Sequence, residues 1–146
     1  MNRYKWDAVF SVCAYAASML VVAAALTIGA RTWESATGDS ALIALEYLVP
    51  IIMFWLGVPM LIASTVTLLL PSESASRTGQ FVSAIAHLPS ALLLTFYVTG
   101  MDRTVPGSAY SIAGFTLGIV IHLAWIALST KAFLRAPASV TSPYSG

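Results

Sequence analysis

Charged residues are scarce in this sequence. Of its 146 residues, 7 are Lys or Arg and 6 are Asp or Glu, so that 9% of the chain is charged; soluble domains carry about a quarter. Hydrophobic residues make up 58% of the chain. So few charges cannot form a water-facing surface over so much apolar area, which indicates an integral membrane protein. The net charge of +1 also argues against a nucleic-acid partner, because phosphate binding requires a dense Lys and Arg surface.

Cysteine and the common enzyme motifs are also lacking. The single cysteine, Cys13, excludes a disulfide within the chain and any site built from a cluster of cysteines. The sequence contains no H-E-x-x-H, no G-x-S-x-G, no phosphate-binding glycine loop and no paired carboxylates. It therefore offers no basis for predicting an enzyme.

Long apolar runs are what the chain does have. Each is long enough to cross a hydrocarbon core about 30 Å thick, which takes about 20 apolar residues. We expect an all-α integral membrane protein, a single domain over residues 1–135 formed by an antiparallel four-helix transmembrane bundle, with a flexible tail at 136–146. The expected spans are residues 8–30, 50–70, 81–99 and 110–134, and the expected loops between the apolar runs are residues 31–40, 71–79 and 100–109.

The second apolar run, residues 41–70, is too long for a simple span. As one helix its 30 residues would extend about 45 Å. We expect residues 41–49 to lie in the membrane interface and the span to begin at Pro50, with a kink at Pro59. The alternative is one long tilted helix with two kinks.

The distribution of basic residues predicts the orientation in the membrane. With both termini inside, the inner segments hold five basic residues and the outer loops hold only Arg31 and Arg103. Membrane proteins favour Lys and Arg on the cytoplasmic side. We therefore expect a multi-pass protein of the inner or plasma membrane with both termini cytoplasmic. The inner basic residues are Arg3, Lys5, Arg77, Lys131 and Arg135.

Small and polar residues form a stripe along each expected helix. Membrane helices pack through such residues, because lipid tails are as apolar as the side chains and no hydrophobic driving force brings apolar helix faces together. The fourth span contains a GxxxG motif at Gly114 and Gly118, the second contains Gly57, and the third contains Ser83 and Ser90. We expect these residues to pack helices within the bundle, and the alternative is contact with a partner or a second copy of the chain.

Two histidines are the main candidates for chemistry. His87 and His122 lie on the polar stripes of the third and fourth spans, at depths that agree within about 2 Å. Ionisable groups at that depth face protein or a water-filled cavity. The pair is compatible with axial ligation of haem b, with a metal ion held together with Met53 or Met60, or with proton relay. The simplest alternative is two neutral imidazoles, each hydrogen-bonded to Ser, Thr or a backbone carbonyl.

Glu46 is the single carboxylate inside an apolar run. If residues 41–49 are interfacial, Glu46 lies near water and has little role. If the helix is continuous, Glu46 lies in the outer third of the bilayer, within reach of Arg31 or Arg103.

Function is predicted mainly by elimination. The leading hypothesis is helix–helix binding to a partner, either as an accessory subunit of a membrane complex or as an immunity-type protein against a membrane-inserting toxin. The alternative is a haem- or metal-binding redox protein that uses His87 and His122. A small channel or transporter is a further alternative, based on the prolines of the second helix and the polar stripes.

Overall fold

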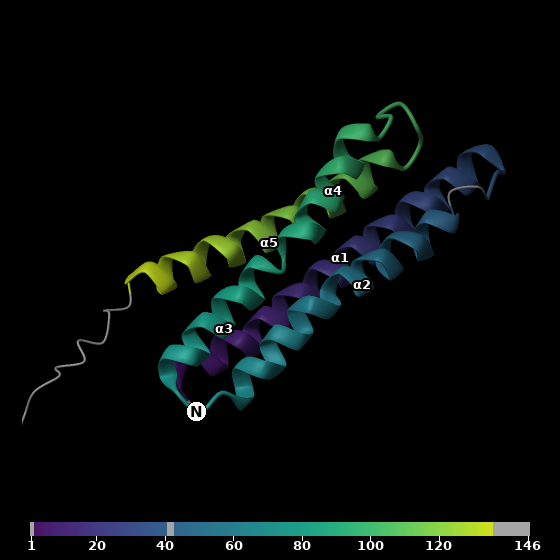
Figure 1. The fold of residues 1–146 in the computed structure, drawn as a ribbon. Coiled ribbons are helices and arrows are strands. Elements are labelled where there is room, and N and C mark those ends of the chain that lie inside the picture. The colour runs from purple at the N-terminus through teal and green to yellow at the C-terminus, as the bar shows by residue number, and fades with distance from the viewer. Residues whose placement is uncertain (1, 41–42, 136–146) are drawn as a thin grey trace, which may run out of the picture.

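Helices account for the ordered architecture of the chain. The computed structural model describes residues 2–40 and 43–135, although not the side chains of residues 43–46. Within these ranges there are five α-helices and no strand (Figure 1). They are α1 (Arg3–Thr37), α2 (Ile43–Leu69), α3 (Glu73–Ile85), α4 (Leu88–Gly100) and α5 (Ser108–Arg135).

Four segments of the described chain are long and apolar enough to cross a membrane. Helices α3 and α4 follow each other closely and together form one of these segments. The expectation of an all-α protein with four candidate membrane-spanning helices is confirmed. The segments are Arg3–Thr37, Tyr47–Leu69, Glu73–Gly100 and Ser108–Arg135.

Two helices extend into residues that we expected to be loops. Helix α1 continues to Thr37, and Gly38 ends it with a φ of 71° and an N–H bond to the Glu34 carbonyl oxygen. Helix α3 begins at Glu73, inside the expected loop at 71–79. Ser72 caps it by accepting a hydrogen bond from the Ala75 N–H, 3.2 Å away. We expected loops in these segments because they are polar. A helix can nevertheless continue through polar residues beyond its apolar run.

The second apolar run forms one continuous helix. Helix α2 begins at Ile43 and passes through Pro50 and Pro59 to Leu69, so residues 43–49, which we expected in the membrane interface, form one helix with the expected span. Membrane helices tolerate proline because neighbouring groups compensate for the lost backbone bond. Glu46 belongs to α2, but its side chain is outside the described residues, as is the tail at 136–146.

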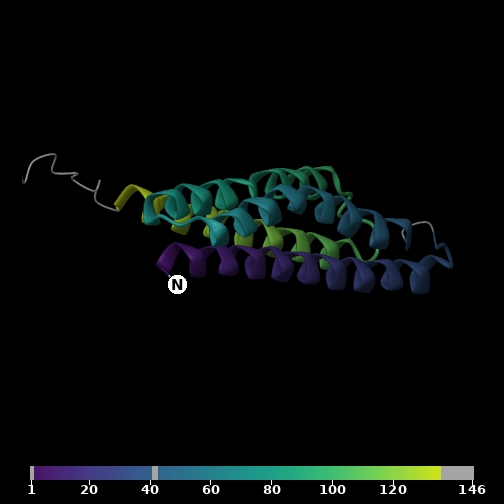
Figure 2. The same ribbon diagram turned by 60° about the horizontal axis from the view of Figure 1, so that its bottom comes forward.

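The helices form an elongated bundle (Figures 1 and 2). Helix α1 packs against α2, α3 and α5. Helix α4 packs mainly against α5, and α3 also packs against α2. The first residues of α1 and the last residues of α5 lie at the same end (Figure 2). We call this end, which holds Arg3 and Arg135, the terminal end, and the opposite end, which holds Thr37 and Ser108, the far end.

The two halves of the bundle have different cores. In the half toward the far end, buried apolar side chains form a cluster. In the half toward the terminal end, most buried side chains are polar. The apolar cluster consists of Val22, Leu26, Val49, Met53, Leu94 and Phe115. The buried polar residues of the terminal half include Ser11, Ser64, Thr67, Ser76, Gln80, Ser83 and Ser129.

Candidate functional site

A helix break places His87 in the centre of the bundle. Helix α3 ends at Ile85, and Pro89 follows in the first turn of α4. Proline has no N–H to donate and its ring crowds the carbonyl one turn earlier, so a helix is interrupted before it. The His87 N–H bonds to the Ala84 carbonyl oxygen, 3.1 Å away, and the imidazole is fully buried.

His122 meets His87 from the middle of α5. Its side chain is also fully buried, and the two Nδ1 atoms are 2.9 Å apart. The ring centroids are 5.1 Å apart and the rings are at 68° to each other. One imidazole therefore donates its Nδ1 proton to the other. This direct contact places the two histidines at the same level of the bundle.

Serines on α1 bind the outer nitrogen of each imidazole. Ser11 lies 2.9 Å from Nε2 of His87, and Ser18 lies 3.0 Å from Nε2 of His122. These two serines are seven residues apart, so they lie on one face of α1, about 10 Å apart along its axis. All four ring nitrogens of the pair therefore have hydrogen-bond partners.

The serine contacts continue to α3 and α2. Ser83 donates to Ser11 over 2.9 Å, and Ser64 lies 2.6 Å from Ser83. The exposed fraction of each of these three serines is at most 1%. A single line of hydrogen bonds thus joins α2, α3, α1, the histidine pair and α1 again.

The donors set a single direction along this line. Ser83 donates to Ser11, and Ser18 donates to the Gly118 carbonyl oxygen, 3.5 Å away. A hydroxyl has only one hydrogen to donate. Ser64 must then donate to Ser83, Ser11 to His87 Nε2, and His122 Nε2 to Ser18.

The direction also assigns the tautomers of the two neutral imidazoles. His87 accepts at Nε2 and carries its proton on Nδ1, which it donates to Nδ1 of His122. His122 carries its own proton on Nε2. Two neutral imidazoles fully satisfied by hydroxyls and by each other match the simplest interpretation of the sequence.

Tyr15 covers the pair from the far-end side. Its hydroxyl donates to the Met53 carbonyl oxygen, 2.5 Å away, and also bonds to Ser90. Its ring centroid lies 5.3 Å from that of His87 and 5.1 Å from that of His122. Because the tyrosine hydroxyl has its own partners, Tyr15 packs on the imidazoles and does not extend the line.

The geometry does not fit a haem between the two histidines. Two nitrogens on opposite sides of one iron are about 4 Å apart, twice a metal–imidazole bond length, with a flat macrocycle between the rings. Here the two Nδ1 atoms are in direct hydrogen-bond contact. The Nε2 atoms are held by serines on the opposite sides of the rings.

A metal site also lacks ligands in the described part of the chain. Structural and catalytic metal ions usually take three or four protein ligands. Among the described residues, no group of three His, Cys, Asp or Glu side chains comes close enough together to hold a metal ion. Of the two methionines considered, Met60 has its Sδ atom 3.6 Å from the Ser64 Oγ atom, which makes it an alternative acceptor for the hydrogen that Ser64 donates to Ser83 in this line.

The small residues of the expected stripes pack within the chain. A Cβ atom on Gly114 would overlap the side chain of Ala25 on α1, and one on Gly57 would overlap the ring of Tyr15. At Gly118 it would meet Leu94, Ser18 and Val22. The GxxxG face is therefore covered by α1 and α4. Of the two serines singled out in the sequence, Ser83 belongs to the hydrogen-bonded line and Ser90 binds Tyr15.

Sequence reasoning did not assign Ser11, Tyr15, Ser18 and Ser64 to the site. They lie among the small and polar residues that form the expected packing stripes. Their spacing on α1, at residues 11, 15 and 18, is the one signal that could have identified three of them, because these positions share a face at the depth of the histidines.

Comparison with known proteins adds no further assignment. No family model matches the sequence, and no curated protein or solved structure matches the chain.

Proposed function

We propose that the protein is a proton relay of the cell membrane, in which His87 and His122 take up a proton inside an antiparallel four-helix bundle. The single observation that carries this proposal is the line of buried hydrogen bonds that runs through both imidazoles. Imidazole suits the role because it binds a proton on one nitrogen while it releases another from the second.

Proton uptake follows from the direction of the line. A proton that reaches the Ser64 oxygen causes each hydroxyl to pass its own hydrogen onward, from Ser64 to Ser83, then to Ser11 and finally to Nε2 of His87. The net result is one added proton on His87 and three hydroxyls that point the opposite way. The hydroxyl of Ser64 then has an acceptor ready, because Met60 Sδ lies 3.6 Å from its oxygen.

The second imidazole receives the proton in the same manner. The Nδ1 proton of His87 passes to Nδ1 of His122 across the hydrogen bond, in which the two nitrogens are 2.9 Å apart, and this leaves His87 neutral and His122 charged. His122 then donates from both nitrogens, and Ser18 accepts at Nε2. Beyond Ser18 the line ends at the Gly118 carbonyl oxygen, against the apolar cluster. Transfer of a proton onward to the far end therefore requires those apolar side chains to move.

The terminal end provides the entry. Thr67, Ser76 and Gln80 continue the buried polar core from Ser64 and Ser83 toward this end. The Gln80 Oε1 atom is buried and has no hydrogen-bond partner within the described part of the chain. A buried acceptor without a partner is costly, and a water molecule arriving along this route would supply the missing bond.

Proton flux into liposomes tests the relay. Protein reconstituted in liposomes with a potassium diffusion potential should acidify the interior faster than empty liposomes do, as read by a trapped pH-sensitive dye. His87→Gln and His122→Gln should each return the rate to that of empty liposomes. Ser111→Ala, which removes a buried hydroxyl of α5 outside the line, is the matched control and should keep the wild-type rate. Wild-type flux no faster than that of empty liposomes, or full flux in both histidine variants, would overturn the proposal.

Binding to a partner membrane protein is the second candidate, and Trp55 is the observation that favours it. Tryptophan is enriched at the two membrane interfaces, yet Trp55 lies near the middle of α2 with 68% of its surface exposed. A helix of another protein would cover this ring, as expected for an accessory subunit or an immunity-type protein. Co-purification from native membranes tests it, with Trp55→Leu expected to lose the partner. Two results together would contradict this candidate. The protein would purify without a partner, and a strain from which its gene is deleted would grow normally under toxin challenge.

A further inference from the structure

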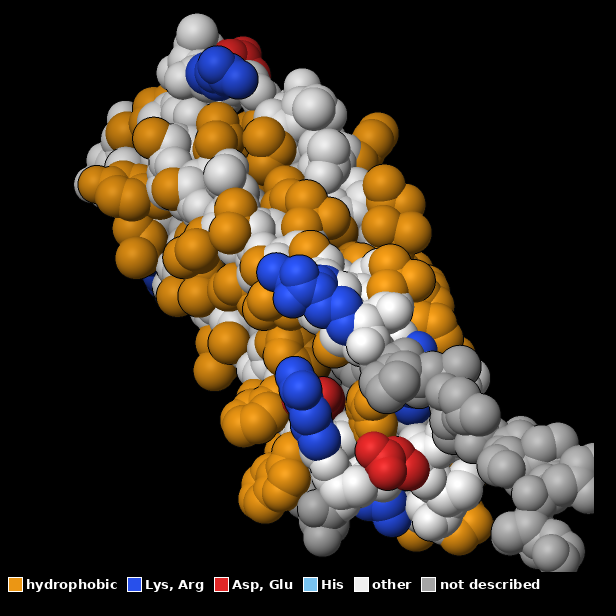
Figure 3. Space-filling model, turned by 90° about the vertical axis from the view of Figure 1, so that its left-hand side faces the viewer, with side chains coloured by type: hydrophobic (Ala, Val, Ile, Leu, Met, Phe, Trp, Pro, Cys, Tyr) orange, Lys and Arg blue, Asp and Glu red, His pale blue; other side chains and the backbone are white. Residues whose placement is uncertain are grey.

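A charged cavity opens at the terminal end of the bundle. Its volume is about 580 Å³, and it lies where α1, α3 and α5 come together. Figure 3 looks onto this end, where Lys and Arg side chains lie among carboxylates, with hydrophobic side chains on the flank. The cavity is lined by Arg3, Tyr4, Glu73, Leu128, Lys131, Ala132 and Arg135.

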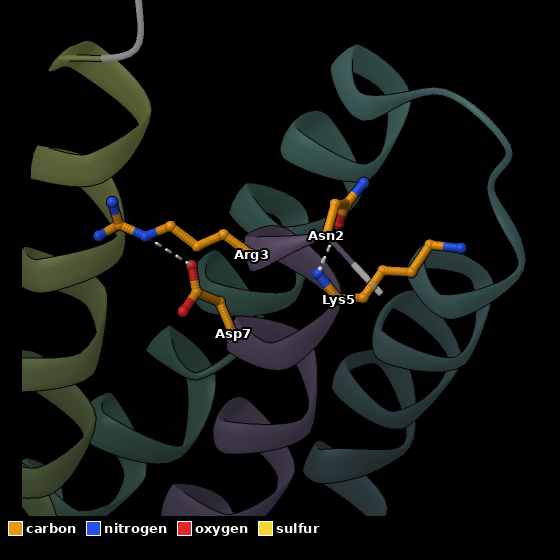
Figure 4. Close-up of polar contacts among 4 residues, drawn as sticks. All are labelled: Asn2, Arg3, Lys5 and Asp7. Carbon is orange, nitrogen blue, oxygen red and sulfur yellow. Dashed lines mark hydrogen bonds and ion pairs between the residues drawn. The ribbon is translucent and has the colours of Figure 1, made fainter.

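The lining carries a net positive charge. Three cations, Arg3, Lys131 and Arg135, face one carboxylate, that of Glu73. Arg3 extends toward α5, as Figure 4 shows, and its Nε lies 3.9 Å from a carboxylate oxygen of Asp7. The side chain of Arg3 is 78% exposed, so this ion pair leaves the guanidinium free to bind a further anion.

Part of the cavity wall is apolar. Leu128 and Ala132, one turn apart on α5, line the cavity together with Lys131 and Arg135 of the same helix. Leu128 is 62% exposed. A cavity with cations at its mouth and an exposed apolar wall suits an amphipathic anion better than a free phosphate, which would gain nothing from the leucine.

We infer that this cavity binds the headgroup of an anionic phospholipid that carries hydroxyl groups, such as phosphatidylglycerol. The phosphate lies against Arg3, Lys131 and Arg135, and an acyl chain follows Leu128 along α5. The Glu73 carboxylate accepts hydrogen bonds from the headgroup hydroxyls. Basic pockets between membrane helices are known to bind anionic headgroups. The inference requires that the helices span a bilayer, and it does not depend on proton transfer.

Native mass spectrometry of the detergent-solubilised full chain tests the site. The protein is titrated with phosphatidylglycerol and, separately, with phosphatidylcholine of the same chain length. Wild-type protein should retain phosphatidylglycerol preferentially. Replacement of Arg3, Lys131 or Arg135 by Gln should weaken this binding by about fivefold for each cation removed.

Lys5→Gln provides the matched control. Lys5 lies at the same end of α1, but its side chain points away from α5 (Figure 4) and does not line the cavity. This variant should bind phosphatidylglycerol as the wild type does. Equal losses in Lys5→Gln and in the three cavity variants would show a diffuse charge effect and would overturn the site.

Two further measurements separate the lipid from its parts. Inorganic phosphate, added in excess, should not displace phosphatidylglycerol, whereas displacement would show that the cavity recognises phosphate alone. Glu73→Gln should reduce the preference for phosphatidylglycerol over phosphatidic acid, which lacks the headgroup hydroxyls. An unchanged preference in that variant would contradict the role given to Glu73.

Discussion

At the scale of single residues, hydroxyl groups decide the state of the two histidines. Each imidazole has one nitrogen bound to a serine of α1 and the other bound to its partner ring. A buried imidazole without these partners would pay the full cost of losing its contacts with water. The four bound nitrogens therefore satisfy the hydrogen-bonding groups of two imidazoles in the interior of an apolar protein.

Ser11→Ala should destabilise the protein by about 1–3 kcal/mol, because it leaves Nε2 of His87 without its donor and the Ser83 hydroxyl without its acceptor in a buried site. Unfolding in mixed detergent, followed by circular dichroism, measures the loss. Ser76→Ala is the matched control, since among the described residues the buried Ser76 hydroxyl bonds only to the carbonyl oxygen of Ser72, the N-cap of the same helix. A loss in Ser11→Ala no larger than that in Ser76→Ala would count against the network.

Asp102 provides a pH-dependent contact outside the spans. The Thr104 backbone N–H, and then its hydroxyl, hold the pKa of the Asp102 carboxyl below its ordinary value of 3.8. The contribution of these bonds to folding is therefore complete above about pH 3.8 and is lost as the pH falls through the lowered pKa. Thr104→Val removes the hydroxyl and keeps the N–H, so it should reverse part of the shift. Carbon-13 NMR titration of Asp102 in both proteins measures it, and identical titration curves would contradict this assignment.

At the scale of helices, two glycine-lined contacts and one break determine how the site is assembled. Gly114 and Gly118 let α5 approach α1 closely, which brings His122 to Ser18. Pro89 interrupts the third candidate span, which frees His87 to enter the bundle between α3 and α4. The glycines thus position the axis of α5, whereas Pro89 positions the side chain of His87.

Gly114→Ala should separate α5 from α1, because the added Cβ overlaps the side chain of Ala25. Overpacking of this kind costs about 1–3 kcal/mol. Thermal unfolding in detergent should show a lower midpoint for this variant. Gly100→Ala is the control, since a Cβ at this last residue of α4 meets nothing within 4 Å, and its midpoint should match that of the wild type. Equal midpoints for both variants would refute tight packing at Gly114.

At the scale of the whole molecule, the bundle is polar in one half and apolar in the other. The polar half opens toward the terminal end, where the cationic cavity also lies. In the orientation that we propose, this end faces the cytoplasm. Protons would then enter from the cytoplasmic side, and the anionic lipid would come from the inner leaflet.

The orientation itself makes a testable prediction. Five basic residues at the terminal end against two in the expected outer loops favour cytoplasmic termini. Fusions of alkaline phosphatase to either terminus should be inactive, whereas a fusion within residues 101–107 should be active. Active fusions at both termini would reverse the orientation, together with the side from which protons are proposed to enter.

Some features of this protein follow from local sequence alone. Four apolar runs predict four candidate spans, because crossing a membrane depends on the length and hydropathy of a single segment. The depth of His87 and His122 is equally local, since it follows from their positions within two runs. Helix ends were predicted less well, as at Thr37 and Glu73, because the capping contacts at Gly38 and Ser72 decide them.

The partners of the histidines were decided only by the tertiary structure. Whether His87 faces His122, a lipid or a cofactor depends on how far each helix is rotated about its axis, and no single run contains that information. The break before Pro89 and the glycine contacts of α5 set those rotations, and they bring Ser11 and Ser18 within hydrogen-bond distance of the imidazoles. The sequence by itself determined that two ionisable groups lie at matching positions within two apolar runs. Packing alone determined that they bind each other.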